Sequence, residues 1–208
     1  MIVDQYEYLK NILSDVRVVF DVGAKEGADT VQFLRIFPQA HVWAFDCADK
    51  AVQGLWQRFG NERRVTVVNQ ALLDHSGIMS FYPCTRPGSS SIYPVTRVFA
   101  EEAPGLSVTE VLCTTVDEYV QEREIERVDL LKIDVEGADY LVLQGCEQLL
   151  DENRIRAVFC ELLFYPYYEG QHYYHEVIDL MVSRGFSLYV LYPQYWGGRL
   201  RYANALFM

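Results

Sequence analysis

The sequence lacks the signals that would place the protein in or across a membrane. Its 208 residues contain no apolar run of the roughly eighteen residues that a membrane-spanning helix needs. The N-terminal segment carries Asp4 and Glu7 and has no apolar core followed by a small-residue cleavage site, unlike a secretory signal. From these features we expect a cytoplasmic protein.

Positive charge is also scarce. The chain has 18 Lys and Arg residues against 29 Asp and Glu residues, which gives a formal net charge of −11. Proteins that bind nucleic acid need a basic face to neutralise phosphates, and anionic membranes attract basic segments. The composition therefore argues against a nucleic-acid partner and against a membrane partner.

Cysteine is sparse and irregularly spaced. The five cysteines are an odd number and include no C-x-x-C pair, so reduced thiols are expected rather than a disulfide framework or a zinc site. Half of the residues are hydrophobic, which suits one α/β domain with a sizeable core over residues 1–208. Residues 1–14 are expected to form an N-terminal helix on this domain.

The chain is organised around residues 16–27, VRVVFDVGAKEG, which predict a buried strand, a glycine turn and the start of a helix. Similar alternation follows, and alternation with short connections predicts a parallel sheet covered by helices on both faces. A proline-, glycine- and serine-rich stretch interrupts it and predicts an inserted β and loop region over 74–115. Further strands are expected at 40–45, 65–68, 128–133, 156–160, 186–192 and 202–208, and helices at 50–59, 136–150 and 173–184.

Four of the predicted strands end in an acidic residue. Because ligands of open parallel sheets bind beyond the carboxyl ends of the strands, these acids are expected to line one site. The four residues are Asp21, Asp46, Asp134 and Glu161.

Asp46 follows the second strand, about two dozen residues after the first glycine turn. An acid in that position accepts hydrogen bonds from the hydroxyls of a bound ribose, or it caps the helix that follows. Both roles are compatible with the sequence.

The sequence also lacks the G-x-G-x-x-G fingerprint of dinucleotide sites and the Walker pattern. We expect Glu26 to face the site beside Asp21, which disfavours a pyrophosphate and favours a cationic cofactor. S-adenosylmethionine fits, with its ribose on Asp46 and its ammonium group on Asp21 or Asp134. A nucleotide-dependent oxidoreductase and a non-catalytic nucleoside-binding module are the alternatives.

Several stretches together resemble the FkbM-type methyltransferases, a branch of the class I S-adenosylmethionine-dependent enzymes. The most specific is VDLLKIDVEGADYLVLQG at 128–145, and the likeness covers roughly residues 16–208. It is supported by FDVGAKEG at 20–27, AFD at 44–46, NQALLDHSG at 69–77, GSSS at 88–91, CELLFYPYYEGQ at 160–171 and RGFSLYVLYP at 184–193.

The resemblance implies an α/β, Rossmann-like fold with a mainly parallel sheet of seven strands, the last one antiparallel. It also implies methyl transfer from S-adenosylmethionine to a hydroxyl oxygen of a small-molecule acceptor, such as a sugar or a natural product. The positions that this likeness assigns to the cofactor or its surroundings are Asp21, Gly23, Ala24, Lys25, Gly27, Thr30, Asp46, Cys47, Ala71, Leu72 and Asp134.

Three positions depart from the family pattern, which usually has Asn, Glu and Pro where this chain has Lys25, Asp46 and Cys47. Asp46 keeps the acid on a shorter side chain. We expect the Lys25 side chain to lean outward or to pair with Glu26.

Transfer to a hydroxyl calls for a general base, because a neutral hydroxyl is a poor nucleophile. Asp134 and Glu161 are the best candidates, and His172 is a lesser one. Asp134 could instead bind the amino group of the cofactor, and Glu161 could be a structural cap. Paired carboxylates also admit a divalent metal such as Mg²⁺, and Lys132 is expected to pair with a site acid.

A cluster of aromatic residues follows Glu161 directly. Such a cluster is compatible with an acceptor pocket, with the contact surface of a homo-oligomer, or with ordinary core packing. The 88–91 loop is expected to close over the acceptor. The aromatic residues are Phe164, Tyr165, Tyr167, Tyr168, Tyr173 and Tyr174.

Overall fold

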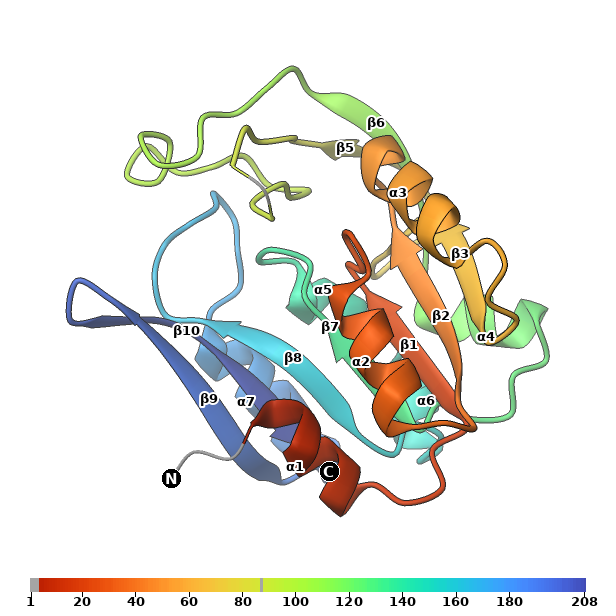
Figure 1. Ribbon diagram of the computed structural model, residues 1–208. Coiled ribbons are helices and arrows are strands. Elements are labelled where there is room, and N and C mark those ends of the chain that lie inside the picture. The colour runs from red at the N-terminus through yellow and green to blue at the C-terminus, as the bar shows by residue number, and fades with distance from the viewer. Residues whose placement is uncertain (1–3, 87) are drawn as a thin grey trace.

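The computed structural model describes residues 4–86 and 88–208, and its centre is a seven-stranded sheet (Figure 1). The strand order is β3–β2–β1–β7–β8–β10–β9, and all neighbours are parallel except at β10, which is antiparallel to β8 and to β9. This confirms the predicted α/β sheet and its antiparallel last strand. The strands are β1 (Val18–Val22), β2 (His41–Asp46), β3 (Val65–Asn69), β7 (Leu130–Ile133), β8 (Val158–Leu163), β9 (Leu188–Trp196) and β10 (Arg199–Phe207).

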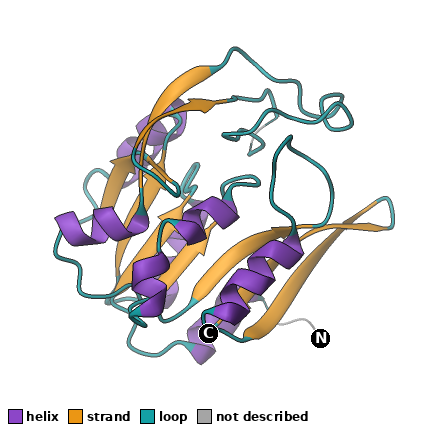
Figure 2. Cartoon of the chain, turned by 180° about the vertical axis from the view of Figure 1, so that it is seen from behind, coloured by secondary structure: helices purple, strands orange, loops and turns teal. Residues whose placement is uncertain are grey.

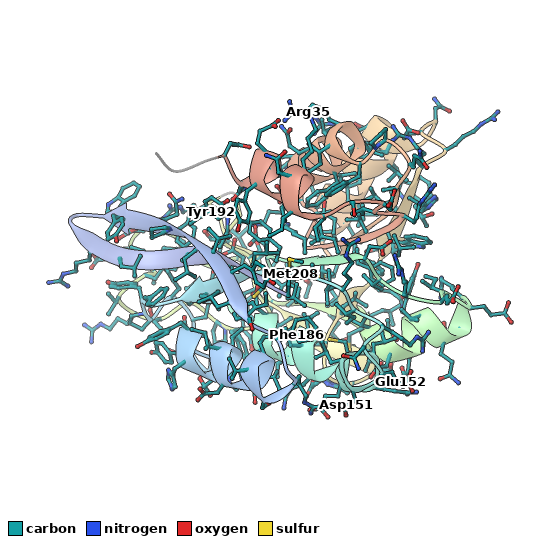
Figure 3. All side chains as sticks on the ribbon, turned by 90° about the horizontal axis from the view of Figure 1, so that it is seen from below. Arg35, Asp151, Glu152, Phe186, Tyr192 and Met208 are labelled. Carbon is teal, nitrogen blue, oxygen red and sulfur yellow. The ribbon has the colours of Figure 1, made fainter. Side chains whose placement is uncertain are left out.

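Helices cover both faces of this sheet (Figures 1 and 2). Successive strand residues point to opposite faces, so Val19 packs under one helical layer while Phe20 and Val22 pack under the other. Seen from below, Figure 3 shows the sheet edge-on between these layers. One layer holds α1 (Gln5–Ile12), α2 (Ala28–Ile36) and α3 (Asp49–Phe59); the other holds α4 (Val116–Glu122), α5 (Asp139–Gln144), α6 (Glu147–Asp151) and α7 (Tyr174–Ser183).

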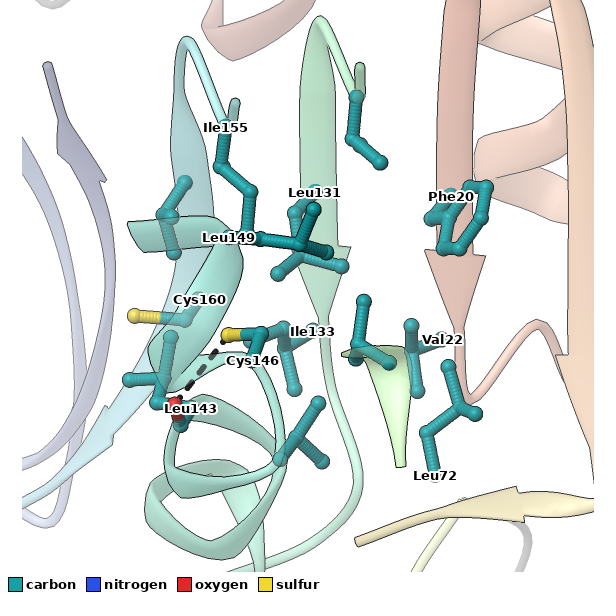
Figure 4. Close-up of a cluster of buried hydrophobic side chains, with 14 of the residues drawn as sticks. Phe20, Val22, Leu72, Leu131, Ile133, Leu143, Cys146, Leu149, Ile155 and Cys160 are labelled. Carbon is teal, nitrogen blue, oxygen red and sulfur yellow. Dashed lines mark hydrogen bonds between the residues drawn. The ribbon is translucent and has the colours of Figure 1, made fainter. Parts of the chain in front are cut away.

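The largest cluster of the core lies between the sheet and the layer of α4 to α7 (Figure 4). Strand residues such as Leu131, Ile133 and Cys160 meet Leu143 and Leu149 from the helices, and all are essentially buried. Burial of this apolar surface fixes the sheet beneath the helices and therefore fixes the position of the strand ends.

The chain leaves the main sheet after β3 to form a second, three-stranded sheet. Its order is β4 (Ala71–Leu72), β6 (Thr109–Thr114), β5 (Gly77–Phe81), which matches the β excursion expected over 74–115. The long loop between β5 and β6 returns toward the main sheet, and its Val95 pairs with Tyr168 in the loop that follows β8. The insertion therefore lies over the carboxyl edge of the main sheet (Figure 1).

Three local expectations were wrong or incomplete. The helix expected over 136–150 is two helices, because Gly145 packs so close to the Leu73 carbonyl that a Cβ would lie 1.9 Å from its oxygen. The short helix α4 was not predicted. Glu161 does not end its strand, since β8 continues to Leu163.

The expected N-terminal helix is present as α1, and Asp4 caps it by accepting hydrogen bonds from the Tyr6 and Glu7 amides. Residues 1–3 of the expected segment lie outside the described part of the chain. Within residues 4–86 and 88–208, no helix is both long enough and apolar enough to span a bilayer.

Candidate active site

The glycine turn after β1 packs directly on the end of β7. Gly23 has a φ of +77°, and a Cβ there would lie 2.0 Å from the backbone oxygen of Asp134. The amides of Gly23 and Ala24 donate to the Phe45 carbonyl at 3.0 and 2.9 Å. Only glycine fits this combination of left-handed backbone and close approach, so the turn joins the ends of β1, β2 and β7.

Asp46 holds the glycine loop and the start of α3 together. Its Oδ2 accepts from the Lys25 amide and its Oδ1 from the Ala48 amide, both at 2.9 Å. The bond from Ala48 orders the turn before α3, but α3 has no side-chain cap, so the capping role that the sequence allowed is not formed. Because each carboxylate oxygen has two lone pairs, both oxygens can accept a further hydrogen bond.

A buried lysine lies beneath the loop. Lys132 Nζ is 3.0 Å from Asp21 Oδ1 and 2.9 Å from Asp29 Oδ2, and Thr30 Oγ1 donates to Asp21 at 2.6 Å. Burial would lower the pKa of Lys132, but the carboxylates of Asp21, Asp134 and Asp29 raise it overall. The expected ion pair of Lys132 with a site acid is thus present.

A second lysine lies above the loop, and its placement corrects the sequence-based expectation. Lys25 Nζ is 3.2 Å from both oxygens of Asp134 and 2.8 Å from Glu136 Oε1, so the side chain neither leans outward nor pairs with Glu26. Glu26 is exposed and does not face the site. The carboxylates that do so are Asp46, Asp134 and Glu136.

Glu136 anchors the inserted loop over the strand ends. Its Oε2 accepts from the Tyr168 hydroxyl at 2.7 Å, and the same hydroxyl is 3.2 Å from the Ser89 carbonyl. Ser91 Oγ donates to the backbone carbonyl of Glu136 at 2.7 Å. These bonds hold the 88–91 segment against the loop that follows β7.

These groups surround a cavity of about 570 Å³ of empty space, its open mouth included. One end is polar, with Lys25, Asp46, Asp134 and Glu136, and the rest is largely apolar. The apolar and small lining groups include Val22, Phe45, Ala71, Leu72, Phe81, Ile92 and Val135.

Glu161 lies next to Asp134 on the adjacent strand. Ile133 is in register with Cys160, so the residues that follow them project from the same face of neighbouring strands. Burial raises the pKa of the Glu161 carboxyl well above its usual value, and the carboxylates of Asp134, Glu136 and Asp139 raise it further.

Asp139, at the start of α5, is buried behind this pair. Its carboxylate accepts from the Glu161 amide at 3.1 Å and from the Val135 amide at 3.4 Å. Burial, with the nearby Asp134 carboxylate, raises its pKa to about 7. Asp139 therefore links β8 to the loop that carries Asp134 and Glu136.

A model of the methyltransferase FkbM domain matches residues 21–188, which include all of these strand ends. The chain belongs to the FkbM methyltransferase domain family. This confirms the resemblance seen in the sequence.

Among curated proteins, the FkbM chain is similar to the 2-O-methyltransferase NoeI of Sinorhizobium fredii (strain NBRC 101917 / NGR234). The two are 25% identical over 186 residues, which cover 85% of this chain and 75% of that protein.

Among solved structures, the fold is similar to that of an rRNA methylase from Streptococcus thermophilus, with a TM-score of 0.55, 13% identity, and coverage of 100% of this chain and 98% of the other. It is also similar to Aeropyrum pernix fibrillarin in complex with S-adenosyl-L-methionine, with a TM-score of 0.54, 11% identity, and coverage of 98% and 73%. These likenesses establish a class I methyltransferase fold.

The cavity of the FkbM chain brings together only part of the predicted residue set. Its lining includes seven of those positions: Gly23, Lys25, Asp46, Cys47, Ala71, Leu72 and Asp134.

The other predicted residues, Glu161 included, are not among those that line the cavity. Asp21 and Thr30 are fully buried against Lys132, and Ala24 packs in the cluster around α3. A Cβ at Gly27 would lie 2.3 Å from the Phe59 ring, so Gly27 serves the contact between α2 and α3.

His172 lies just before α7, in the helical layer formed by α4 to α7. Its ring stacks on Tyr140 with 4.2 Å between the ring centroids, and its Nδ1 is 2.9 Å from Glu176 Oε1. These contacts hold the start of α7 against α5. The structure does not bring this candidate base to the cavity.

Sequence reasoning missed Glu136 as part of the site, and it considered Tyr168 and the 88–91 loop only as surroundings of the acceptor. Glu136 lay inside the quoted 128–145 stretch but was assigned to a helix. The signal for a loop in the sequence was the Glu136-Gly137 pair. In the structure these two residues have φ values of +56° and +93°, which are unsuited to a helix. Within residues 4–86 and 88–208, no group of three or more His, Cys, Asp or Glu residues is arranged to hold a metal ion.

Proposed function

We propose that the protein transfers a methyl group from S-adenosylmethionine to a hydroxyl oxygen of a small-molecule acceptor. The observation that carries this proposal is the cavity, in which an apolar slot meets a carboxylate-rich end at the carboxyl edge of the sheet. The curated relative is named as a 2-O-methyltransferase, which favours an oxygen nucleophile.

The cavity suits each part of this cofactor. The apolar walls around Leu72 and Phe81 suit an adenine ring, and Asp46 retains acceptor capacity for a ribose diol. Asp134 and Glu136 suit the ammonium and sulfonium charges. The Lys25 ammonium group has three N–H donors. Asp134 and Glu136 each accept from one of them, and in this proposal the third donates to the cofactor carboxylate.

The cofactor supplies an electrophilic methyl group, and the chain supplies position and a base. The strand ends hold the acceptor hydroxyl in line with the methyl carbon. Glu161 takes the hydroxyl proton, because its raised pKa makes it a stronger base than an ordinary carboxylate. Asp134 orients the cofactor beside it.

Calorimetry with S-adenosylhomocysteine, NAD and ATP tests the cofactor. We expect S-adenosylhomocysteine to bind at micromolar concentration and Asp46→Ala to weaken that binding, with Asp49→Ala as a control on the exposed start of α3. Micromolar binding of NAD without binding of S-adenosylhomocysteine would instead support an oxidoreductase. A screen of hydroxylated acceptors with labelled S-adenosylmethionine, with EDTA or with added Mg²⁺, then tests transfer and any need for a metal.

A further inference from the structure

Arg201, near the start of β10, is stacked on an aromatic ring and pairs with no carboxylate of the described residues. Its Cζ lies 3.5 Å from the ring centroid of Tyr165, in the loop after β8. Its Nε is buried without a hydrogen-bond partner in the described part of the chain. The arginines that form ion pairs within residues 4–86 and 88–208 are at other positions.

A continuous series of contacts joins Arg201 to the cavity. The Tyr165 and Tyr167 rings are 5.2 Å apart, and the Tyr167 and Tyr168 rings are 6.2 Å apart. The Tyr168 hydroxyl then donates to Glu136, which lines the cavity. The guanidinium therefore lies at the far end of an aromatic path that begins at the site.

The same path extends toward the inserted loop and the β9–β10 hairpin. Phe99 packs edge-on against Tyr167 at 4.8 Å, and Arg86 lies over the rings of Phe99 and Trp196 at 5.6 and 6.0 Å. Trp196 is 66% exposed. We call this surface the arginine–aromatic rim; it comprises Arg86, Phe99, Tyr165, Tyr167, Trp196 and Arg201.

The rim lies at the carboxyl edge of the main sheet, the edge that also holds the cavity, and the six rim residues are not among those that line the cavity. β10 is antiparallel to β8, so it begins where β8 ends, and Phe164 donates to the Arg201 carbonyl at 2.9 Å. In Figure 1 the loop after β8 rises at this edge toward the insertion, and the hairpin tip extends beside it.

Charge separates the rim from the reacting edge. Asp134, Glu136 and Glu161 would repel an anion placed among them, whereas a stacked guanidinium presents planar donors that suit a carboxylate or a phosphate. Tyr167 lies between these regions: burial raises its pKa to about 12, Arg201 lowers it, and Glu161 raises it.

We propose that the arginine–aromatic rim is the acceptor subsite and that Arg201 selects acceptors bearing a carboxylate or phosphate group beside the methylated hydroxyl. The tyrosine rings hold the acceptor ring, and Arg201 holds its anionic group away from the carboxylates. This proposal rests on the proposed function. Arg201 lies beyond residues 21–188, the range that the family model matches.

The experiment measures binding of matched probes to the protein with and without saturating S-adenosylhomocysteine. One pair is p-nitrophenyl β-glucuronide and p-nitrophenyl β-glucoside, which differ in a carboxylate; the other is glucose 6-phosphate and glucose. In one of the two pairs, we expect the anionic probe to bind about tenfold more tightly than the neutral probe. The pair that shows this preference tells whether the subsite takes a carboxylate or a phosphate. A short single-stranded RNA is a fifth probe.

Two variants separate a specific role of Arg201 from a structural one. Arg201→Gln is expected to abolish the preference while leaving affinity for the neutral probe within about twofold. Arg123→Gln is the matched control, because Arg123 is also stacked, 3.9 Å from the Tyr119 ring, but on α4. It is expected to keep the preference.

Equal binding of anionic and neutral probes, a preference that survives Arg201→Gln, or no binding of any sugar probe would overturn the subsite. Tighter binding of RNA than of every sugar would also overturn it. Failure of S-adenosylhomocysteine to bind is a separate result that counts against the proposed function, and the probe titrations without it still report on the rim.

Discussion

Lys25 Nζ lies 2.8 Å from Glu136 Oε1, so a cation in the first glycine loop neutralises a carboxylate 111 residues later in the chain. Burial raises the pKa of Glu136, and Lys25 opposes that shift. The two loops that form the polar end of the cavity are thus electrostatically dependent on each other.

Replacement of this cation tests the dependence. Lys25→Met leaves Asp134 and Glu136 unneutralised, and we expect the free energy of unfolding at pH 8 to fall by about 1–3 kcal/mol. The loss should be smaller at pH 5, where more of the Glu136 carboxyl is protonated. Urea unfolding at both pH values measures it.

The matched control for this change is Lys50→Met, because Lys50 is exposed on α3. It should alter stability by less than about 0.5 kcal/mol at either pH. A Lys25→Met protein as stable as the native one at pH 8 would show that the two loops are held by other contacts.

Glu161 is expected to govern the pH dependence of methyl transfer. The base must be deprotonated, and a raised carboxyl pKa moves the acidic limb of the kcat profile to higher pH. Glu161→Gln should lower kcat by about a hundredfold or more and remove that limb. The measurement uses the acceptor found in the screen.

Two comparisons make the Glu161 result specific. Glu169→Gln, in the exposed part of the loop that follows β8, should leave kcat and the limb unchanged. Asp134→Asn should lower turnover and weaken binding of S-adenosylhomocysteine, whereas Glu161→Gln should leave that binding intact. Unchanged turnover in both Glu161→Gln and Asp134→Asn would remove carboxylate base catalysis from the mechanism.

Asp139 should make stability decline as pH rises through a defined window. Its folded-state pKa is about 7 against an ordinary value of 3.8, so the folded protein binds more protons than the unfolded chain between those values. Stability from this group is present below pH 3.8 and is lost as pH rises toward 7, by up to about 1.4 kcal/mol per pH unit.

Asp139→Asn removes this titration. The stability of the variant relative to the native protein should therefore increase between pH 4 and pH 7, as measured by urea unfolding. Asp179→Asn, on the exposed face of α7, should show no such trend. A constant difference between Asp139→Asn and the native protein across the window would mean that Asp139 is already ionised in the folded state.

The sheet was predictable because strand and helix periodicities are local properties of the sequence. The strand-end positions of Asp46 and Asp134 followed from the same pattern. The pairing of Lys25 with Glu136 did not, because it depends on how two distant loops meet. Asp21 was expected to end its strand, but β1 continues to Val22, and the alternation of side chains across the sheet buries Asp21 on Lys132.

Left-handed backbone was the least visible feature of the site. Lys25 has a φ of +51°, in the region where asparagine is enriched among non-glycine residues. Lys25 thus combines a strained backbone with ion pairs to Asp134 and Glu136. Glu136 has the same left-handed backbone conformation, so a loop follows β7 where apolar periodicity alone suggested a helix.

The glycine turn itself offers a paired test of close packing. Gly23→Ala would place a Cβ 2.0 Å from the Asp134 carbonyl oxygen at a φ of +77°, whereas Gly54, inside α3, has open space around its Cα. We expect Gly23→Ala to lower the melting temperature and to abolish binding of S-adenosylhomocysteine. Gly54→Ala should stabilise the protein by about 0.5–1 kcal/mol, because alanine favours a helix interior. Thermal unfolding and calorimetry of both variants test whether glycine is required at the joined strand ends. Equal binding of S-adenosylhomocysteine by Gly23→Ala and by the native protein would instead indicate that the turn tolerates an added methyl group.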